Sequence, residues 1–318
     1  MQNHRAEAPG GEIENVYPPA GSRLPPRMKN PPSYGRSYKV LLIGEDVKDV
    51  WVPCEIAGIA HEDPVLRLRP VSIQEEPGGL SFCQKLFESL LPGTKTFSIP
   101  YSETTITRYL SEKPPRVLFT VEENLPLLAG ENIRHCQQLL VRNAIEQWSP
   151  DLVFLWEKWE GRGFDWEVSL ENERGREHPL VATDVPRVRR LYPPDYRKDY
   201  LHGDGTGKAA QILTLRTSAK ESVLYRGEEP PVIQQNPVCE VGSPIGAGDT
   251  MFVSLLCFLM EKNLLGKIPT ERQCTRALQW AQAAAYLQLQ HSRCYIPSYK
   301  DIKKTHELLR RTIWMKRP

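Results

Sequence analysis

Four consecutive residues, Gly246-Ala247-Gly248-Asp249, combine the residue types that phosphate chemistry requires. They open a largely apolar segment that predicts a helix over residues 249–262. The two glycines leave backbone N–H groups accessible to a ligand, and a helix N-terminus adds unpaired N–H donors and a positive dipole end. The segment therefore predicts a cradle for an anion.

Asp249 has two interpretations at this position. An aspartate at the start of a helix can simply cap it, which is a common structural role. The same carboxylate can also be a general base within reach of the bound anion. A base beside an anion cradle fits phosphoryl transfer to a hydroxyl group, where positioning and charge stabilisation supply most of the catalysis. The motif alone leaves both interpretations open.

A second glycine-rich segment, residues 202–210, resembles a phosphate-binding P-loop but departs from its pattern. The P-loop requires Gly where this chain has His202, and Ser or Thr where it has Ala209. We therefore interpret this segment as a surface turn.

The composition is that of an ordinary globular protein. Hydrophobic residues make up 40% of the 318 residues, and the net charge of +2 favours neither nucleic acid nor a membrane as partner. The seven cysteines form no CxxC pair, so neither a zinc site nor a disulfide scaffold is indicated, and no metal-binding side chains are expected. The longest apolar run is too short to span a bilayer and no secretory pattern is visible, so we expect a cytoplasmic protein.

Residues 1–36 are rich in Pro, Gly, Asn and charge, with few large apolar side chains. Such a segment buries too little surface to offset its ordering entropy, so we expect a flexible tail, with a partner-binding arm as the alternative. Residues 37–318 are expected to form one domain.

Within this domain, short alternating strands precede a region in which continuous apolar strands alternate with helices. This order predicts an α/β fold with three αβα layers, a mostly parallel central sheet and a small β-sheet lid. The lid strands are expected within about residues 52–77 and 95–124. The first buried strand is expected over residues 38–46, one alternating strand over 65–76, a strand over 236–241, and helices over 132–148, 249–262, 271–290 and 299–312.

In this setting the GAGDT sequence at the head of a late helix resembles the PfkB/ribokinase family of carbohydrate kinases. The N-terminal part is similar to the D-glycero-β-D-manno-heptose-7-phosphate kinase type within that family. Gly44, Asp49 and Trp51 match its first elements, and "QEEPGG" matches its turn, ending in Gly78-Gly79. The similarity extends over residues 38–310 and is weakest in the middle third.

The resemblance implies ATP as phosphate donor, Mg²⁺ carried by the nucleotide, and a sugar or sugar phosphate as acceptor. It implies that Asp249 is the base and that Gly246, Ala247 and Gly248 form the anion hole. Trp51, Arg116 and Thr217 also have ordinary structural interpretations, as a core aromatic, a solvated strand residue and a turn residue. The implied binding residues are Asp49, Trp51, Gly78 and Gly79 for the sugar, Arg116 for a phosphate on the acceptor, and Thr217 and Gln282 for the nucleotide.

Five departures from the family pattern surround the same expected site. They replace an aspartate before the glycines, a substrate-binding asparagine, the N-x-x-E that orders magnesium-bound water, a glycine and a later asparagine. The residues found instead are Ser243, Phe82, Pro194 with Arg197, Lys220 and Gln282.

Two hypotheses follow. The first is an ATP-dependent kinase for a sugar or sugar phosphate. The second is a non-catalytic relative that acts as a binding or assembly subunit, in which Asp249 only caps a helix and the basic segment 187–198 is a docking surface or a solvated loop. Because exposed lid-strand edges need covering, we also expect a homodimer formed through the lid strands.

Overall fold

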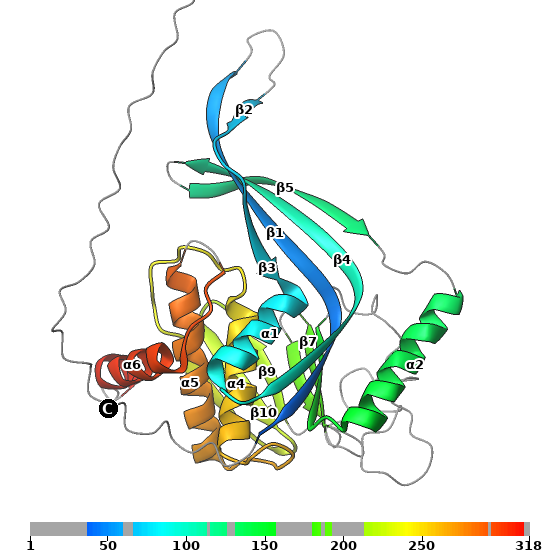
Figure 1. Cartoon of the computed structure of the whole chain (residues 1–318). Helices are drawn as coiled ribbons and strands as arrows, with labels where there is room; N and C mark the ends of the chain where they lie inside the picture. The colour runs from blue at the N-terminus through cyan, green and yellow to red at the C-terminus, as the bar shows by residue number, and fades with distance from the viewer. Residues whose placement is uncertain are drawn as a thin grey trace, which may run out of the picture. The chain divides into compact units, whose positions relative to one another are not determined.

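The computed structural model describes residues 37–59, 66–112, 115–125, 131–156, 180–185, 188–192, 213–291 and 294–314 (Figure 1). Residues 36–318 form one structural unit. The N-terminal segment 1–36, the glycine-rich segment 202–210, and Pro194 and Arg197 lie outside the described residues.

A mixed sheet forms the middle layer of this unit. Its four central strands are parallel, in the order β4-β1-β6-β7, and antiparallel strands continue the sheet from β7 through β8, β9 and β10 to β11. The bounds are β1 (Lys39–Ile59), β4 (Lys95–Glu112), β6 (Leu152–Trp156), β7 (Leu180–Val185), β8 (Val188–Tyr192), β9 (Leu213–Thr217), β10 (Glu221–Arg226) and β11 (Glu229–Gln235).

The lid continues the two longest central strands. β1 and β4 run parallel from Lys39 and Lys95 to Cys54 and Ser111 (Figure 1). The strand β6 pairs with β1 only as far as Gly44. Three strands pair antiparallel with these extensions: β2 (Leu66–Pro70), β3 (Gln74–Gly78) and β5 (Pro115–Leu125). One continuous strand pair therefore connects the central sheet to the lid.

Helices cover both faces of the central sheet (Figure 1). α2 packs Val141 and Ala144 against Leu41 and Ile43 of β1. On the opposite face, Phe154 of β6 contacts aromatic rings of α1 and α4. The helices are α1 (Gly79–Leu90), α2 (Glu131–Trp148), α4 (Ala247–Glu261), α5 (Glu271–Gln290) and α6 (Tyr299–Leu309), which continues into a π-helical turn over Arg310–Trp314. The structure is thus a three-layer αβα domain with a β lid.

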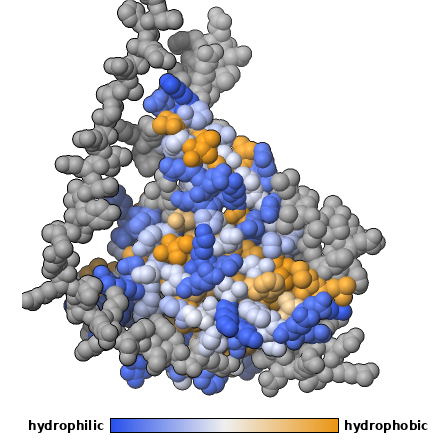
Figure 2. Space-filling view, in the orientation of Figure 1, coloured by the Kyte–Doolittle hydropathy of each residue, from blue (hydrophilic) through white to orange (hydrophobic). Residues whose placement is uncertain are grey.

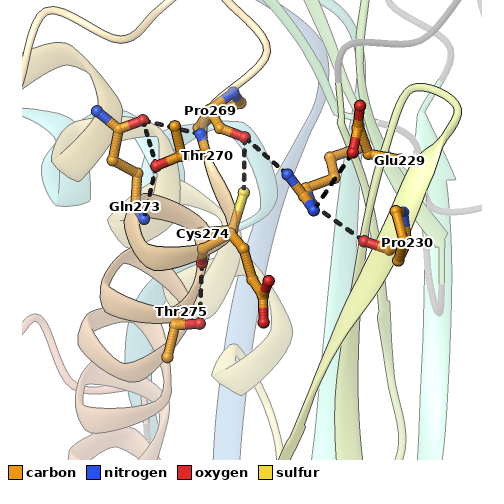
Figure 3. A network of polar contacts seen from close by, with 9 residues as sticks. Glu229, Pro230, Pro269, Thr270, Gln273, Cys274 and Thr275 are labelled. Carbon is orange, nitrogen blue, oxygen red and sulfur yellow. Dashed lines mark hydrogen bonds and ion pairs between the residues drawn. The ribbon is translucent and has the colours of Figure 1, made fainter.

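The start of α5 is fixed by a capping box, in which Thr270 and Gln273 satisfy each other's backbone N–H groups (Figure 3). The preceding carbonyl of Pro269 accepts a hydrogen bond from Arg226, whose guanidinium also binds the carbonyl of Pro230. These contacts tie the β10–β11 hairpin to the start of α5 (Figure 3).

Several expected elements differ from those observed. The first strand does not end at Asp46 but continues to Ile59, and the strand expected over residues 65–76 is two strands, β2 and β3. No strand occupies residues 236–241, which form a loop containing Pro237, because β11 has already ended at Gln235. The helix α1 and the strand β8 were not expected.

Candidate functional site

The GAGD motif lies at the N-terminus of α4. Gly246 is the N-cap residue and has φ 74°, a left-handed conformation that favours glycine. Asp249 lies in the first turn of the helix, and its side chain is 20% exposed. The motif thus has a glycine at its left-handed position, and the N–H of Ala247 donates to the carbonyl of Pro244 at 3.3 Å.

Two side chains lie against the outer side of this turn. A Cβ atom on Gly246 would be 3.0 Å from the ring of Phe82 and 3.6 Å from the sulfur of Cys294. Phe82 belongs to α1 and is only 1% exposed. One of the five departures, Phe82 in place of asparagine, thus fills the space next to the glycine turn.

A buried group of two acids and one arginine lies beneath the motif. The Nε of Arg189 is 2.6 Å from Oδ1 of Asp184, and its Nη2 is 3.3 Å from Oδ1 of Asp249. Asp184 is at the end of β7 and pairs with Arg189 of β8 in the strand register. The guanidinium also lies against Gly248, where any added Cβ would overlap it. The basic segment expected to be a docking surface or a solvated loop therefore contributes a buried arginine, because Asp184 faces it across the strand pair.

Burial raises the pKa of Asp184 to about 8 because it disfavours the charged carboxylate. Arg189 opposes this shift, and the negative charge of Asp249 adds to it. The folded protein therefore retains a proton on Asp184 at pH values where the unfolded chain, with a pKa near 3.8, has lost it.

The sign of this linkage gives a testable pH dependence. The contribution of neutral Asp184 to the free energy of unfolding is fully present below 3.8, its pKa in the unfolded chain. It is lost as the pH rises through about 8, its pKa in the folded protein. We expect the free energy of unfolding to fall over this window, and the fall to be smaller in an Asp184→Asn variant, which carries no titratable proton. Urea unfolding at a series of pH values tests this, and equal pH slopes in the two proteins would contradict it.

A cavity of about 830 Å³ borders the motif. It extends from Thr217 and Lys220 at the β9–β10 turn to Ala247 and Gly248 at the head of α4. Its volume falls within the range of about 300–1,000 Å³ that small-molecule sites occupy. Ala247 and Gly248 of the GAGD motif thus line a cavity of small-molecule size.

Gln282 of α5 lines this cavity and is 2% exposed. Its Nε2 donates to the carbonyls of Gln234 and Gln235 and to Oδ1 of Asn236, which fixes the orientation of the amide. Its Oε1 is buried and has no hydrogen-bond partner. The amide is therefore held by contacts within the protein, and its Oε1 is covered by neighbouring groups.

The inner face of the lid carries the expected sugar-binding residues. Asp49 of β1 is 3% exposed, and its Oδ1 is 2.8 Å from Nη2 of Arg108 on β4. A Cβ on Gly78 would be 2.6 Å from Oδ2 of Asp49, so the glycine makes room for this carboxylate. Gly79 makes room for Val47 in the same way. The structure thus brings Asp49, Gly78 and Gly79 together.

Trp51 lies beside this group, opposite Gln74 of β3 and Arg108 of β4 in the strand register. The guanidinium carbon of Arg108 is 5.6 Å from the centre of a Trp51 ring, a cation–π contact. Three buried polar atoms of this group have no hydrogen-bond partner: Nε1 of Trp51, Oε1 of Gln74 and Nε of Arg108. These two donors and one acceptor are covered by neighbouring groups, so a ligand would reach them only after side chains move.

Cys294 connects the lid patch to the GAGD motif. Burial raises the pKa of its thiol, and the negative charges of Asp49, Glu76 and Asp249 raise it further. The pKa of this one thiol is thus raised by the charges of both Asp49 and Asp249.

Arg116 and Ser243 are two further positions that the sequence analysis singled out. Arg116 lies in β5 opposite Ser111, and its side chain is outside the described residues. Ser243, which replaces the family aspartate, is 5% exposed, and its hydroxyl accepts a hydrogen bond from the N–H of Ile245. Among the described residues, no group of His, Cys, Asp and Glu could hold a metal ion, and no helix is long and apolar enough to cross a membrane.

Three residues of this site were missed by sequence reasoning. Asp184 had a usable signal, because it ends an apolar strand where α/β proteins bind ligands. Arg189 and Arg108 had none, since each acquires its role from a neighbouring strand.

Comparison with known proteins identifies the architecture. Among solved structures, a possible 1-phosphofructokinase from Thermotoga maritima has a TM-score of 0.53 at 13% identity and covers 85% of this chain and 98% of its own. Phosphofructokinase-2 from Escherichia coli, in its tetrameric inhibited form, has a TM-score of 0.52 at 11% identity and covers 86% and 99%. The chain has a ribokinase-like fold. Arabidopsis thaliana ribokinase, solved with ribose and ATP, covers 86% and 99% at 13% identity, with a TM-score of 0.45.

The ribokinase-like fold is therefore shown by structure rather than by sequence. No family model matches the chain, and no curated protein matches it. The similar structures are of carbohydrate kinases of the PfkB/ribokinase family. At 11–13% identity they establish the fold, and the activity of this chain has to be argued from its own residues.

Proposed function

We propose that this chain is an ATP-dependent kinase that phosphorylates a hydroxyl group of a sugar or sugar phosphate. The observation that carries the proposal is the cavity of about 830 Å³ that ends at Gly248, next to the partly exposed carboxylate of Asp249. ATP would occupy this cavity with its base near Thr217 and Gln282 and its phosphates at the head of α4.

The chemistry assigned to the motif is a direct transfer. The carboxylate of Asp249 accepts the proton of the acceptor hydroxyl as the hydroxyl oxygen forms a bond to the γ-phosphorus. The bond between the γ-phosphorus and its bridging oxygen breaks, and ADP leaves with the electron pair. Backbone N–H groups of Gly246, Ala247 and Gly248 stabilise the charge on the transferred group. Mg²⁺ bound to the phosphates of ATP neutralises part of their charge.

The lid residues Trp51, Gln74 and Arg108 favour an acceptor with several hydroxyl groups. Nε1 of Trp51, Oε1 of Gln74 and Nε of Arg108 are buried atoms that need partners, and they include both donors and an acceptor. A sugar hydroxyl both donates and accepts, so a sugar would pair with these atoms once the side chains that cover them move. The similarity of the N-terminal part to heptose-7-phosphate kinases makes a heptose phosphate one acceptor to test, with Arg116 as a proposed partner of its phosphate.

A second candidate function is a non-catalytic binding or assembly subunit. Three contacts favour it: Phe82 packs against Gly246, Arg189 binds Asp249, and Arg108 binds Asp49. Each contact occupies a group that the kinase would use. In this function ATP or a sugar binds without transfer.

The two functions are separated by binding and turnover measured on the same protein. We expect calorimetry to detect ATP and at least one member of a panel of sugars, sugar phosphates and heptose phosphates. We expect ADP to form only when ATP, Mg²⁺ and that acceptor are all present. Binding without ADP formation would support the second candidate, and absence of any binding would contradict the kinase.

We also propose that the chain forms a homodimer through the lid strands. Val71, Ile73 and Val121 of this region are 40–68% exposed, and Figure 2 shows hydrophobic residues interspersed with hydrophilic ones on this part of the surface. Sedimentation velocity tests the proposal, and a monomer at micromolar concentration would contradict it.

A further inference from the structure

Among the described residues, Arg189 is the charged group that contacts both the proposed base and the proposed anion hole. Its Nη2 lies 3.3 Å from Oδ1 of Asp249, and the guanidinium lies against the Cα of Gly248. Gly248 also lines the cavity of about 830 Å³. The guanidinium does not line this cavity itself, but it contacts a residue that does.

The electrostatics of this position favour an additional anion. A buried cation at a helix N-terminus faces the positive end of the helix dipole, which is unfavourable unless negative groups compensate. Asp249 provides that negative charge, with Nη2 directed to its carboxylate, while Nε is directed to Asp184. The planar guanidinium binds phosphate oxygens with two parallel hydrogen bonds, so a phosphate at Gly248 would be a better partner than the 3.3 Å contact with Asp249.

We propose that Arg189 binds the terminal phosphate of ATP and that this contact replaces its contact with Asp249. The inference rests on the proposed function, since it assigns the nucleotide to the same cavity. Asp184 holds the Nε side of the guanidinium in place while Nη2 moves from the carboxylate to the phosphate. The carboxylate of Asp249 is then released to accept the acceptor proton. The base therefore becomes available only after the nucleotide has bound.

The first test compares nucleotides that differ in their terminal phosphate. Calorimetry is performed with ATP, ADP and adenosine on the full chain and on Arg189→Gln. Because a hydrogen bond to a charged group is lost, we expect ATP to bind about 10- to 100-fold more weakly to the variant. Adenosine is expected to bind equally to both proteins. The matched control is Arg216→Gln, which removes an exposed arginine packed on Tyr225 and is expected to change neither affinity.

A folding defect is separated from this effect by a second variant. Arg189→Gln leaves Asp184 buried without its ion-pair partner, whereas Asp184→Asn combined with Arg189→Gln leaves two neutral amides. We expect this double variant to show the same selective loss of ATP affinity. Equal weakening of ATP and adenosine in both variants would show that Arg189 only supports the fold, and would overturn the proposal.

The second test uses the competition between Asp249 and the phosphate. If both need the same guanidinium, Asp249→Asn should bind ATP more tightly than the wild type, by about three- to tenfold, and adenosine equally. The gain should disappear when Arg189→Gln is added. An unchanged or lower ATP affinity in Asp249→Asn would overturn the proposal.

These outcomes are independent of turnover. Selective loss of ATP affinity without any phosphoryl transfer would support the role of Arg189 and contradict the kinase. Transfer that survives Arg189→Gln with unchanged ATP affinity would support the kinase and overturn the role of Arg189. A wild-type chain that binds no nucleotide would overturn both.

Discussion

Asp249→Asn is expected to lower the rate of phosphoryl transfer by about 10²–10⁴-fold, which is the usual contribution of a general base. Asparagine keeps the size of the side chain and leaves the N-cap residue, Gly246, unchanged, but it cannot accept the acceptor proton. The fold should therefore survive while the chemical step is lost. The measurement is ADP formation at saturating ATP with the best acceptor of the panel.

The matched control for this variant is Glu271→Gln. Glu271 is the acidic residue in the first turn of α5, so its replacement also removes a negative charge from a helix N-terminus. It is exposed and does not line the nucleotide cavity. We expect nearly wild-type turnover in this variant. If Asp249→Asn kept more than about a tenth of the activity, Asp249 would not be the base.

Phe82→Ala is expected to lower the free energy of unfolding by about 3–5 kcal/mol, the range for removing a buried aromatic ring. Phe82 is 1% exposed and packs from α1 against Gly246, so the truncation leaves a cavity at the head of α4. The left-handed turn at Gly246 then loses its packing against the Phe82 ring. Urea unfolding followed by circular dichroism measures the change in both midpoint and slope.

Phe97→Ala is the control for this second variant. Phe97 is 45% exposed on β4 and contacts Trp148 at a ring-centre distance of 6.0 Å. Its removal should cost less than about 1.5 kcal/mol, since it loses one aromatic pair and little burial. Equal destabilisation by the two variants would contradict the assignment of Phe82 as a core residue that supports the glycine turn.

The helices of the C-terminal half were predictable because their signals are local. α5 begins and ends at the expected residues, since Thr270 and Gln273 form a capping box and an apolar face follows. The GAGD motif likewise lies at the start of its expected helix. In contrast, α1 follows Gly78 and Gly79, which read as a turn, although Leu80, Cys83 and Phe87 have helical spacing.

The sequence does not predict the strand β8 because the strand carries charged residues. Arg189 and Leu191 are buried and Arg190 between them is more exposed, which is the alternation of a strand. Arginine is almost never buried without a partner, so the segment was interpreted as solvated or as a docking surface. Its partner Asp184 is aligned with it only by the β7–β8 register, which is a property of the fold. The same limit applies to Arg108, which meets Asp49 only across the β1–β4 pair.

The most direct test of the proposed kinase uses ATP with a radioactive γ-phosphate. The full chain is incubated with this ATP, Mg²⁺ and the acceptor panel, and the products are separated and identified by mass spectrometry. The proposal predicts labelled sugar phosphate with the wild type, none with Asp249→Asn, and full labelling with Glu271→Gln. Label that stays in ATP for every acceptor, in a protein that binds both ATP and a sugar, would contradict the kinase and leave the non-catalytic binding subunit.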